Sequence, residues 1–202
     1  MEKKQEFFIA VIALFLISLS FFVILSEFSQ EFKYSVSRDG VEFVSNEAPP
    51  GELMQGLSEK SSFIVVSEFR PGTGTTTVMA EPLTMFNSVL VSLGKNVVTI
   101  AKETDATGKI TACQTNDGNV LENRRITVEE CSPLLSDSSR ARIIVGFPSN
   151  SGSSLVIVSS GLVEIQPASL EEVTNVSFLA LQAMYSDSRE ILEQINRVIG
   201  QV

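Results

Sequence analysis

The apolar residues of this chain are concentrated in one long N-terminal run and then recur in shorter, regular patterns. The run extends from Phe7 to Leu25, contains no charged residue and has only two serines as polar positions. A helix of this length covers about 28 Å, which matches a bilayer hydrocarbon thickness of about 30 Å. The pattern predicts a single transmembrane helix that contacts membrane lipid through residues 7–25, within an anchor segment 1–32.

A cleaved signal peptide and a buried core helix are the alternatives to a retained anchor. A signal peptide has an apolar region of about 7–15 residues and a small-residue cleavage site, whereas this run is longer and is followed by SEFSQEF. A helix that is apolar on every side is also hard to bury in a modest chain. Lys3 and Lys4 precede the span, and the next basic residue is Lys33. This bias favours a cytoplasmic N-terminus, so we expect a single-pass cell-membrane protein with residues 33–202 extracytoplasmic.

Residues 33–60 show a different pattern. The segment YSVSRDGVEFVS alternates around Asp39 and Gly40, which predicts a β-hairpin over residues 34–45. The following NEAPPGE contains two prolines and a glycine, and these residues break both helices and strands. We therefore predict a stalk made of a hairpin and a Pro-rich connector between the anchor and the main domain.

The main domain is predicted to cover residues 61–202 and to begin with a βαβ unit. SFIVVSEF (62–69) and NVVTIAKET (96–104) are short β-branched runs typical of buried strands. Between them, apolar residues recur at helical spacing as far as Leu93, and Pro82 is placed for the first turn of that helix. The two strands should be parallel and joined by a right-handed crossover.

The remaining pattern predicts more strands and C-terminal helices. KITACQT (109–115) follows a turn and is an antiparallel hairpin partner, and Thr127 with Glu130 forms a capping box for a short helix. Further predicted elements are strands at 141–147 and 154–166, the latter with a bulge at Gly161, and helices after residue 166 that begin with a Ser169–Glu172 capping box. The predicted fold class is therefore mixed α/β, with one mixed sheet.

Charge and composition exclude several kinds of binding and catalysis for this chain. The chain has 15 Lys+Arg and 24 Asp+Glu, of which two and four lie in residues 1–32, so residues 33–202 carry a net charge of −7. An acidic domain lacks the basic field that binds a phosphate backbone, so we expect no nucleic-acid partner. The chain has no histidine, which excludes histidine general bases and His-ligated zinc from its own residues.

The two cysteines, Cys113 and Cys131, are expected to form a disulfide. An oxidising compartment favours this bond, which would contribute about 3 kcal/mol and would connect a predicted strand to the predicted short helix. Two buried free thiols are the alternative. A metal site is a poorer interpretation because nothing resembles a zinc motif.

Carboxylates remain the only acid–base candidates. Glu68 and Glu103 lie near the C-terminal ends of the two predicted parallel strands, where open α/β sheets bind ligands, and Arg70 is adjacent. These three residues are the weak catalytic candidates of the sequence. Charged residues also occur at strand ends simply because the chain leaves the core there.

The Gly-rich stretch FRPGTGTTT (69–77) lies at the same predicted edge. It has no lysine for a Walker-type loop, and position 77 is threonine where a dinucleotide fingerprint requires glycine. We therefore expect no nucleotide and no cofactor. The sequon at Asn175 falls within a predicted helix, and we expect it to be unused.

The N-terminus KKQEFF followed by a long apolar helix resembles that of type IV pilin-like proteins, in which this helix packs in a filament core. The resemblance covers the anchor segment only, and the acidic residue found inside the apolar run of bacterial pilins is missing, since Glu6 precedes the run. The glycine usual before the pilin cleavage point is also absent, so we carry over no processing site.

Taken together, these patterns lead us to expect a membrane-anchored extracytoplasmic domain that acts in protein–protein interaction or cell-surface assembly, with a protein partner and no assigned catalysis. A pilin-like filament subunit and an anchored carboxylate-dependent enzyme acting on glycans are the alternatives.

Overall fold

The computed structural model describes residues 32–72, 76–117, 120–148 and 152–200. The chain divides into two compact units, Met1–Phe32 and Lys33–Val202, and the second unit is described below. The predicted transmembrane segment, residues 7–25, lies outside the described residues. Within the described ranges, no helix combines the length and the apolar character needed to cross a membrane.

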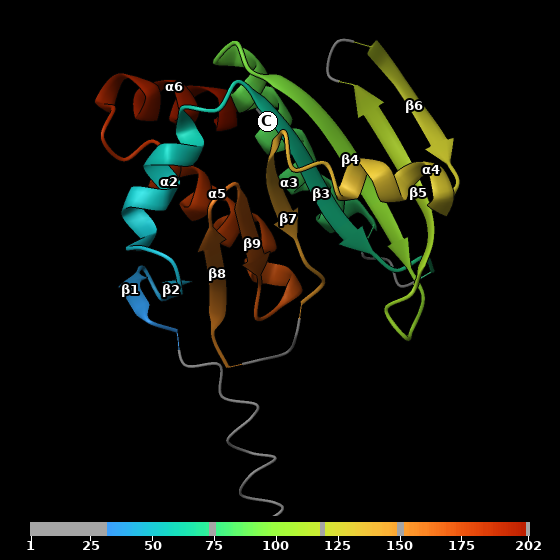
Figure 1. Cartoon of the computed structure of the whole chain (residues 1–202), viewed down its shortest axis with the longest axis horizontal. Coiled ribbons are helices and arrows are strands. Elements are labelled where there is room, and N and C mark those ends of the chain that lie inside the picture. Colours follow the sequence, from blue (N-terminus) through green and yellow to red (C-terminus); the bar gives the residue numbers. More distant parts are fainter. Residues whose placement is uncertain (1–31, 73–75, 118–119, 149–151, 201–202) are drawn as a thin grey trace, which may run out of the picture. The chain divides into compact units, whose positions relative to one another are not determined.

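A nine-stranded mixed sheet forms the centre of the second unit, with the order β1-β2-β8-β9-β7-β3-β4-β5-β6 (Figure 1). Parallel pairs join β2 to β8, β9 to β7, β7 to β3 and β3 to β4, and the other neighbours are antiparallel. The mixed α/β class is therefore confirmed. The strands are β1 (Tyr34–Arg38), β2 (Val41–Ser45), β3 (Ser62–Phe69), β4 (Asn96–Thr104), β5 (Ile110–Asp117), β6 (Val120–Ile126), β7 (Ala141–Val145), β8 (Ser154–Ser159) and β9 (Leu162–Gln166).

The helices cover the two faces of the sheet unequally. Four of them, α2, α3, α5 and α6, contribute buried side chains to the main core on one face, and we call this the helical face. Only α4 contributes to the smaller core on the opposite face. The helices of the described chain are α2 (Pro50–Ser58), α3 (Thr76–Ser92), α4 (Val128–Leu135), α5 (Val173–Met184) and α6 (Arg189–Ile199), with a short 3-10 helix at Leu170–Glu172.

The predicted βαβ unit is present. Strands β3 and β4 pair in parallel from Ser62 opposite Asn96, and α3 connects them. The helix begins at Thr76, however, so Pro82 lies inside it and not in its first turn. The missing N–H of Pro82 costs one helical hydrogen bond, and burial of neighbours such as Phe86 in the main core offsets that cost.

The predicted hairpin over residues 34–45 is also present, but it does not form a stalk. Asp39 and Gly40 both have positive φ, 51° and 80°, as a type I′ two-residue turn requires. Strand β2 pairs in parallel with β8, and the prolines predicted to form a connector instead start α2, since Pro50 is its first residue. Residues 33–60 thus form two strands of the central sheet and a helix that packs in the main core.

Two further predictions are wrong in detail, and one strand was missed. Residues 154–166 form two antiparallel strands and not one bulged strand, because Gly161 has φ 88° and turns the chain. Strand β6 was not predicted, since its sequence VLENRR lacks an alternating apolar pattern. The Ser169 side chain caps no helix, and Glu172 accepts a hydrogen bond from Ser154 Oγ.

Candidate functional site

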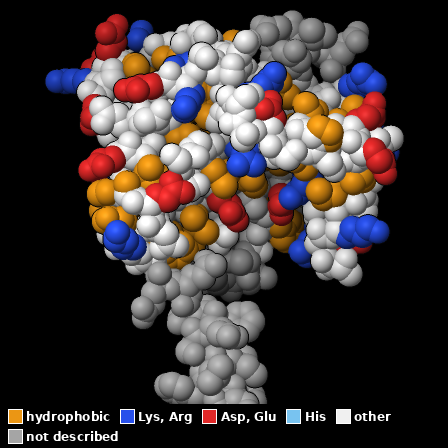
Figure 2. All heavy atoms as spheres, viewed as in Figure 1, with side chains coloured by type: hydrophobic (Ala, Val, Ile, Leu, Met, Phe, Trp, Pro, Cys, Tyr) orange, Lys and Arg blue, Asp and Glu red, His pale blue; other side chains and the backbone are white. Residues whose placement is uncertain are grey.

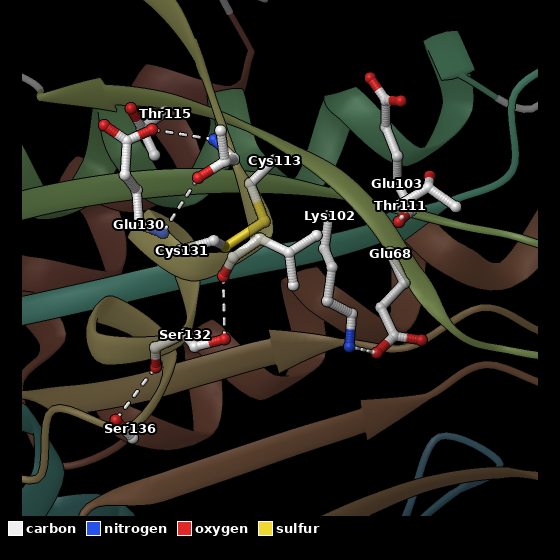
Figure 3. The surroundings of a disulfide bond; sticks show 12 residues. Glu68, Lys102, Glu103, Thr111, Cys113, Thr115, Glu130, Cys131, Ser132 and Ser136 are labelled. Carbon is white, nitrogen blue, oxygen red and sulfur yellow. Dashed lines mark hydrogen bonds and ion pairs between the residues drawn. A yellow bond between two sulfur atoms is a disulfide. The ribbon is translucent and has the colours of Figure 1, made fainter.

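The predicted disulfide is formed, and it fastens α4 to the sheet (Figure 3). Cys113 lies on β5 and Cys131 on α4, their Cα atoms are 6.2 Å apart, and both side chains are fully buried. The predicted capping box begins this helix: Thr127 Oγ1 accepts from the Glu130 N–H, and Glu130 Oε2 accepts from the Thr127 N–H. The position of α4 is therefore fixed both by a local cap and by a covalent link.

Glu68 and Glu103 do not converge. Because Glu68 is opposite Lys102 in the β3–β4 register, the next residue of β4, Glu103, points to the other face. Figure 3 shows the two glutamate side chains leaving their strands in opposite directions. The structure therefore does not bring the two carboxylates into one pocket.

Each glutamate has its own polar partners. Glu68 forms an ion pair with Lys102 on the α4 side of the sheet. Glu103 is 7% exposed, accepts from Arg125 Nη2 at 3.0 Å and from Gln114 Nε2 at 3.3 Å, and lies on the helical face. These charged and amide donors account for the position of this buried carboxyl group.

The Arg70 side chain contacts an aromatic ring. Its guanidinium lies over the ring of Phe147 at 4.3 Å from the ring centre, a cation–π contact. Among the described residues, no group of three or more acidic or cysteine side chains could hold a metal ion. The structure therefore places the two glutamates on opposite faces of the sheet and the Arg70 guanidinium against Phe147.

The α4 side of the sheet is covered over only part of its width. The small core beneath α4 is built on β3, β4, β5 and β6, while β7, β9 and β8 continue beyond it (Figure 1). On these strands, the residues facing away from the helical face are only half-buried. We call this surface the open face, and it consists of Arg142, Ile144, Leu155, Ile157, Ser159, Leu162, Glu164 and Gln166. Ile144 lies at its border and also packs against the core beneath α4.

The register places one carboxylate among the apolar side chains of the open face. Glu164 on β9 is opposite Ile144 on one side and Ile157 on the other. Its Oε1 accepts a hydrogen bond from Gln166 Nε2 at 2.8 Å. Figure 2, drawn from the same direction as Figure 1, shows hydrophobic side chains interspersed with acidic ones on the visible surface. The open face thus combines aliphatic side chains with the carboxylate of Glu164 and the guanidinium of Arg142, which donates a hydrogen bond to the Leu135 carbonyl.

The open face was not predicted from the sequence. The signal is present in β8, where Leu155 and Ile157 alternate with the fully buried Val156 and Val158. A strand that is apolar on both faces indicates cover on both faces. The described helices supply that cover on one side of β8 only, which the sequence of β8 alone does not reveal.

Two hollows lie elsewhere on the described part of the domain. A groove of about 330 Å³ between α3 and strands β4 and β5 is lined by neutral side chains, including Thr84, Asn87 and Gln114. Another of about 290 Å³ includes Tyr185, whose pKa is raised to about 12 by burial. Asn175 is exposed on α5, and Ser177 of its sequon is fully buried within that helix.

Comparisons with protein-family models, with curated proteins and with solved structures find no match to this chain. A functional assignment therefore rests on the geometry of the domain.

Proposed function

We propose that this protein is anchored in the cell membrane by residues 7–25, that residues 33–202 lie outside the cytoplasm, and that this domain acts by binding another protein. The partner surface is apolar with a basic group, and it docks on the open face. No catalytic step is assigned. The observation that carries the proposal is the uneven cover of the sheet: among the described helices, four pack on one face and α4 alone packs on the other.

The energetics of the open face support a docking role. Its four aliphatic side chains, Ile144, Leu155, Ile157 and Leu162, are half-buried in the domain. Burial of apolar surface contributes about 25 cal/mol per Å², so completing their burial would supply part of the free energy of association. Glu164 adds specificity, because a carboxylate among apolar groups disfavours an acidic or purely apolar partner.

The disulfide supports an oxidising, extracytoplasmic location for residues 33–202. Disulfides persist in oxidising compartments and are rare in reducing ones. Cys113 and Cys131 are paired with each other and fully buried, as expected of a structural bond. A chain with an apolar N-terminal run and a structural disulfide in the domain that follows fits a signal-anchored ectodomain.

The two alternatives receive no comparable support. A carboxylate enzyme requires Glu68 and Glu103 to face one substrate, and they project to opposite faces of the sheet. A filament subunit requires the N-terminal helix to continue into the domain as a spine, and that segment lies outside the described residues. The interaction function is therefore the one that an observation on this domain favours.

Topology can be tested with single added cysteines, because the native pair is buried and bonded. Val91 on α3 is 40% exposed, so Val91→Cys should react with a membrane-impermeant maleimide on intact cells. Lys3→Cys is the matched control and should react only after the cells are opened. If Val91→Cys is also protected until the cells are opened, the extracytoplasmic placement is wrong.

Binding through the open face can be tested on solubilised native membranes. The double variant Leu155→Thr/Ile157→Thr places a residue of high β-propensity at both positions of β8 while removing apolar surface. It should release the protein from a larger complex on a native gel, whereas Val91→Thr should leave the complex intact. An unchanged complex in the double variant would contradict docking at the open face.

A further inference from the structure

The outer edge of β1 presents backbone hydrogen-bonding groups that no other described strand uses. β1 is the end strand of the sheet, and β2 is its only strand partner within the part of the chain that the structure describes. Its residues after Tyr34 are all exposed. An edge strand of this kind is a template for pairing with another strand. β1 is short and ends in Arg38, but it contains neither proline nor a bulge, two of the devices that prevent such pairing.

The hairpin register identifies the backbone groups that point outward. In a two-residue hairpin, the residues that flank the turn exchange hydrogen bonds, and the pairs then alternate between bonded and non-bonded. Arg38 and Val41 flank the turn, so Val36 and Tyr34 also direct their backbone groups toward β2. Ser35 and Ser37 therefore direct their N–H and C=O groups toward the free edge.

We propose that β1 pairs with β1 of a second copy of this chain, antiparallel and centred on Val36. In this register Ser35 of each copy is opposite Ser37 of the other, and both belong to the outward-directed set. The pairing is two-fold symmetric and closes on itself. It would satisfy the outward N–H and C=O of both serines in both copies.

The side chains along β1 fit the same register. Val36 is 52% exposed, and it would lie against Val36 of the second copy. Tyr34 would lie opposite Arg38, and Lys33 opposite Asp39, which pairs opposite charges at both ends of the interface. All seven positions from Lys33 to Asp39 are therefore compatible with self-pairing, and no like charges face each other.

The short β1 strand is sufficient for self-pairing if both copies are anchored in the same membrane. Two five-residue strands bury less than the roughly 800 Å² per partner of a standard interface. Tethering in one bilayer raises the effective concentration, which compensates for weak intrinsic affinity. The inference rests on the proposed function only in requiring this shared membrane, and the experiment below distinguishes the failure of one from the failure of the other.

The test is disulfide cross-linking of full-length Val36→Cys in native membranes. A non-hydrogen-bonded antiparallel pair has Cα atoms about 4.5 Å apart, within the range of about 4.4–6.8 Å for disulfides. Mild oxidation should convert most of this variant into a covalent dimer that reduction reverses. Val91→Cys is the matched control, with a similar exposed fraction of 40% on α3, and it should remain monomeric.

Two second-site changes test the register. Ser35→Pro removes an outward N–H and the exposed side-chain hydrogen bond from Ser35 Oγ to Glu42 Oε1. Neither belongs to the backbone ladder between β1 and β2, so the ladder stays intact and the Val36→Cys dimer should be abolished. Lys33→Asp should slow cross-linking roughly two- to five-fold, and adding Asp39→Lys should restore it. Equal dimer yields from positions 36 and 91, or a yield unaffected by both changes, would overturn the proposal.

The outcomes also distinguish this inference from the proposed function. If Val91→Cys is labelled from outside but Val36→Cys gives no dimer, self-pairing is wrong and the anchored ectodomain stands. If Val91→Cys is protected on intact cells while Val36→Cys still forms a dimer, self-pairing stands and the extracytoplasmic placement is wrong.

Discussion

Reducing the Cys113–Cys131 disulfide should lower the stability of the domain by a predictable amount. The bond closes a loop with a sequence separation of 18. In the chain-entropy account, a loop of this length restricts the unfolded state by about 3 kcal/mol at 25 °C. For a domain of this size, each kcal/mol shifts Tm by about 2–4 °C, so reduction should lower Tm by roughly 6–12 °C.

The assay is urea unfolding of residues 33–202, followed by far-UV circular dichroism. The chain contains no tryptophan, so intrinsic fluorescence is a poor probe. The oxidised and reduced forms keep the same side chains, which avoids the cavity that Cys→Ala would leave. Cys113→Ala/Cys131→Ala serves as the control and should not respond to the reductant.

A difference of less than about 1 kcal/mol between oxidised and reduced protein would refute the reasoning. It would mean that the unfolded chain is already restricted near this loop, or that α4 contributes little to the cooperative unit. A difference well above about 5 kcal/mol would also contradict it, because the small core beneath α4 would then be lost together with the bond.

Three further predictions concern local features. Thr127→Ala removes the N-cap of α4 and should cost about 1 kcal/mol in urea unfolding, and a loss below about 0.3 kcal/mol would show that the disulfide alone holds the helix. Gly161→Ala should cost about 1–2 kcal/mol through its φ of 88° alone, since no atom lies within 4 Å of an added Cβ; an unchanged midpoint would show that the turn relaxes. Burial raises the Tyr185 pKa to about 12, above its ordinary value of 10.0. The unfolded state therefore loses that proton first, and stability is retained below pH 10 and falls by about 1–2 kcal/mol as the pH rises from 10 to 12. Tyr185→Phe should abolish this alkaline loss and cost little at neutral pH, because the Oη atom has no hydrogen-bond partner within the described part of the chain.

Local sequence signals predicted the elements that local physics determines. Asp39 and Gly40 supply the two positive φ angles of a tight hairpin, and Thr127 with Glu130 closes a capping box within four residues. The βαβ unit was predicted from two short β-branched runs and from the helical spacing of the apolar residues between them. Each of these features depends on residues close together in the chain, so a short window contains the information.

The missed features depend on contacts between distant segments. The parallel pairing of β2 with β8 joins residues more than a hundred positions apart in the chain, and no pattern in either strand specifies the other. Strand β6 is polar and lies at the sheet edge, where burial does not impose alternation.

The relative positions of Glu68 and Glu103 also depend on a pairing between strands that are distant in the sequence. The sequence placed Glu68 and Glu103 at the same sheet edge, but successive side chains of a strand point to opposite faces. The β3–β4 register decides the outcome, since Glu68 is opposite Lys102 and not Glu103. The open face was also missed, because it depends on which strands α4 covers.

The most direct test of the interaction function is photo-cross-linking in native membranes with a photoreactive amino acid at position 157. Ile157 lies on the open face, whereas Val91 on α3 is exposed on the helical side and provides the control position. The account predicts a discrete adduct between this chain and a different protein from position 157, and none from position 91. Absence of an adduct at position 157, or the same adduct from both positions, would contradict it.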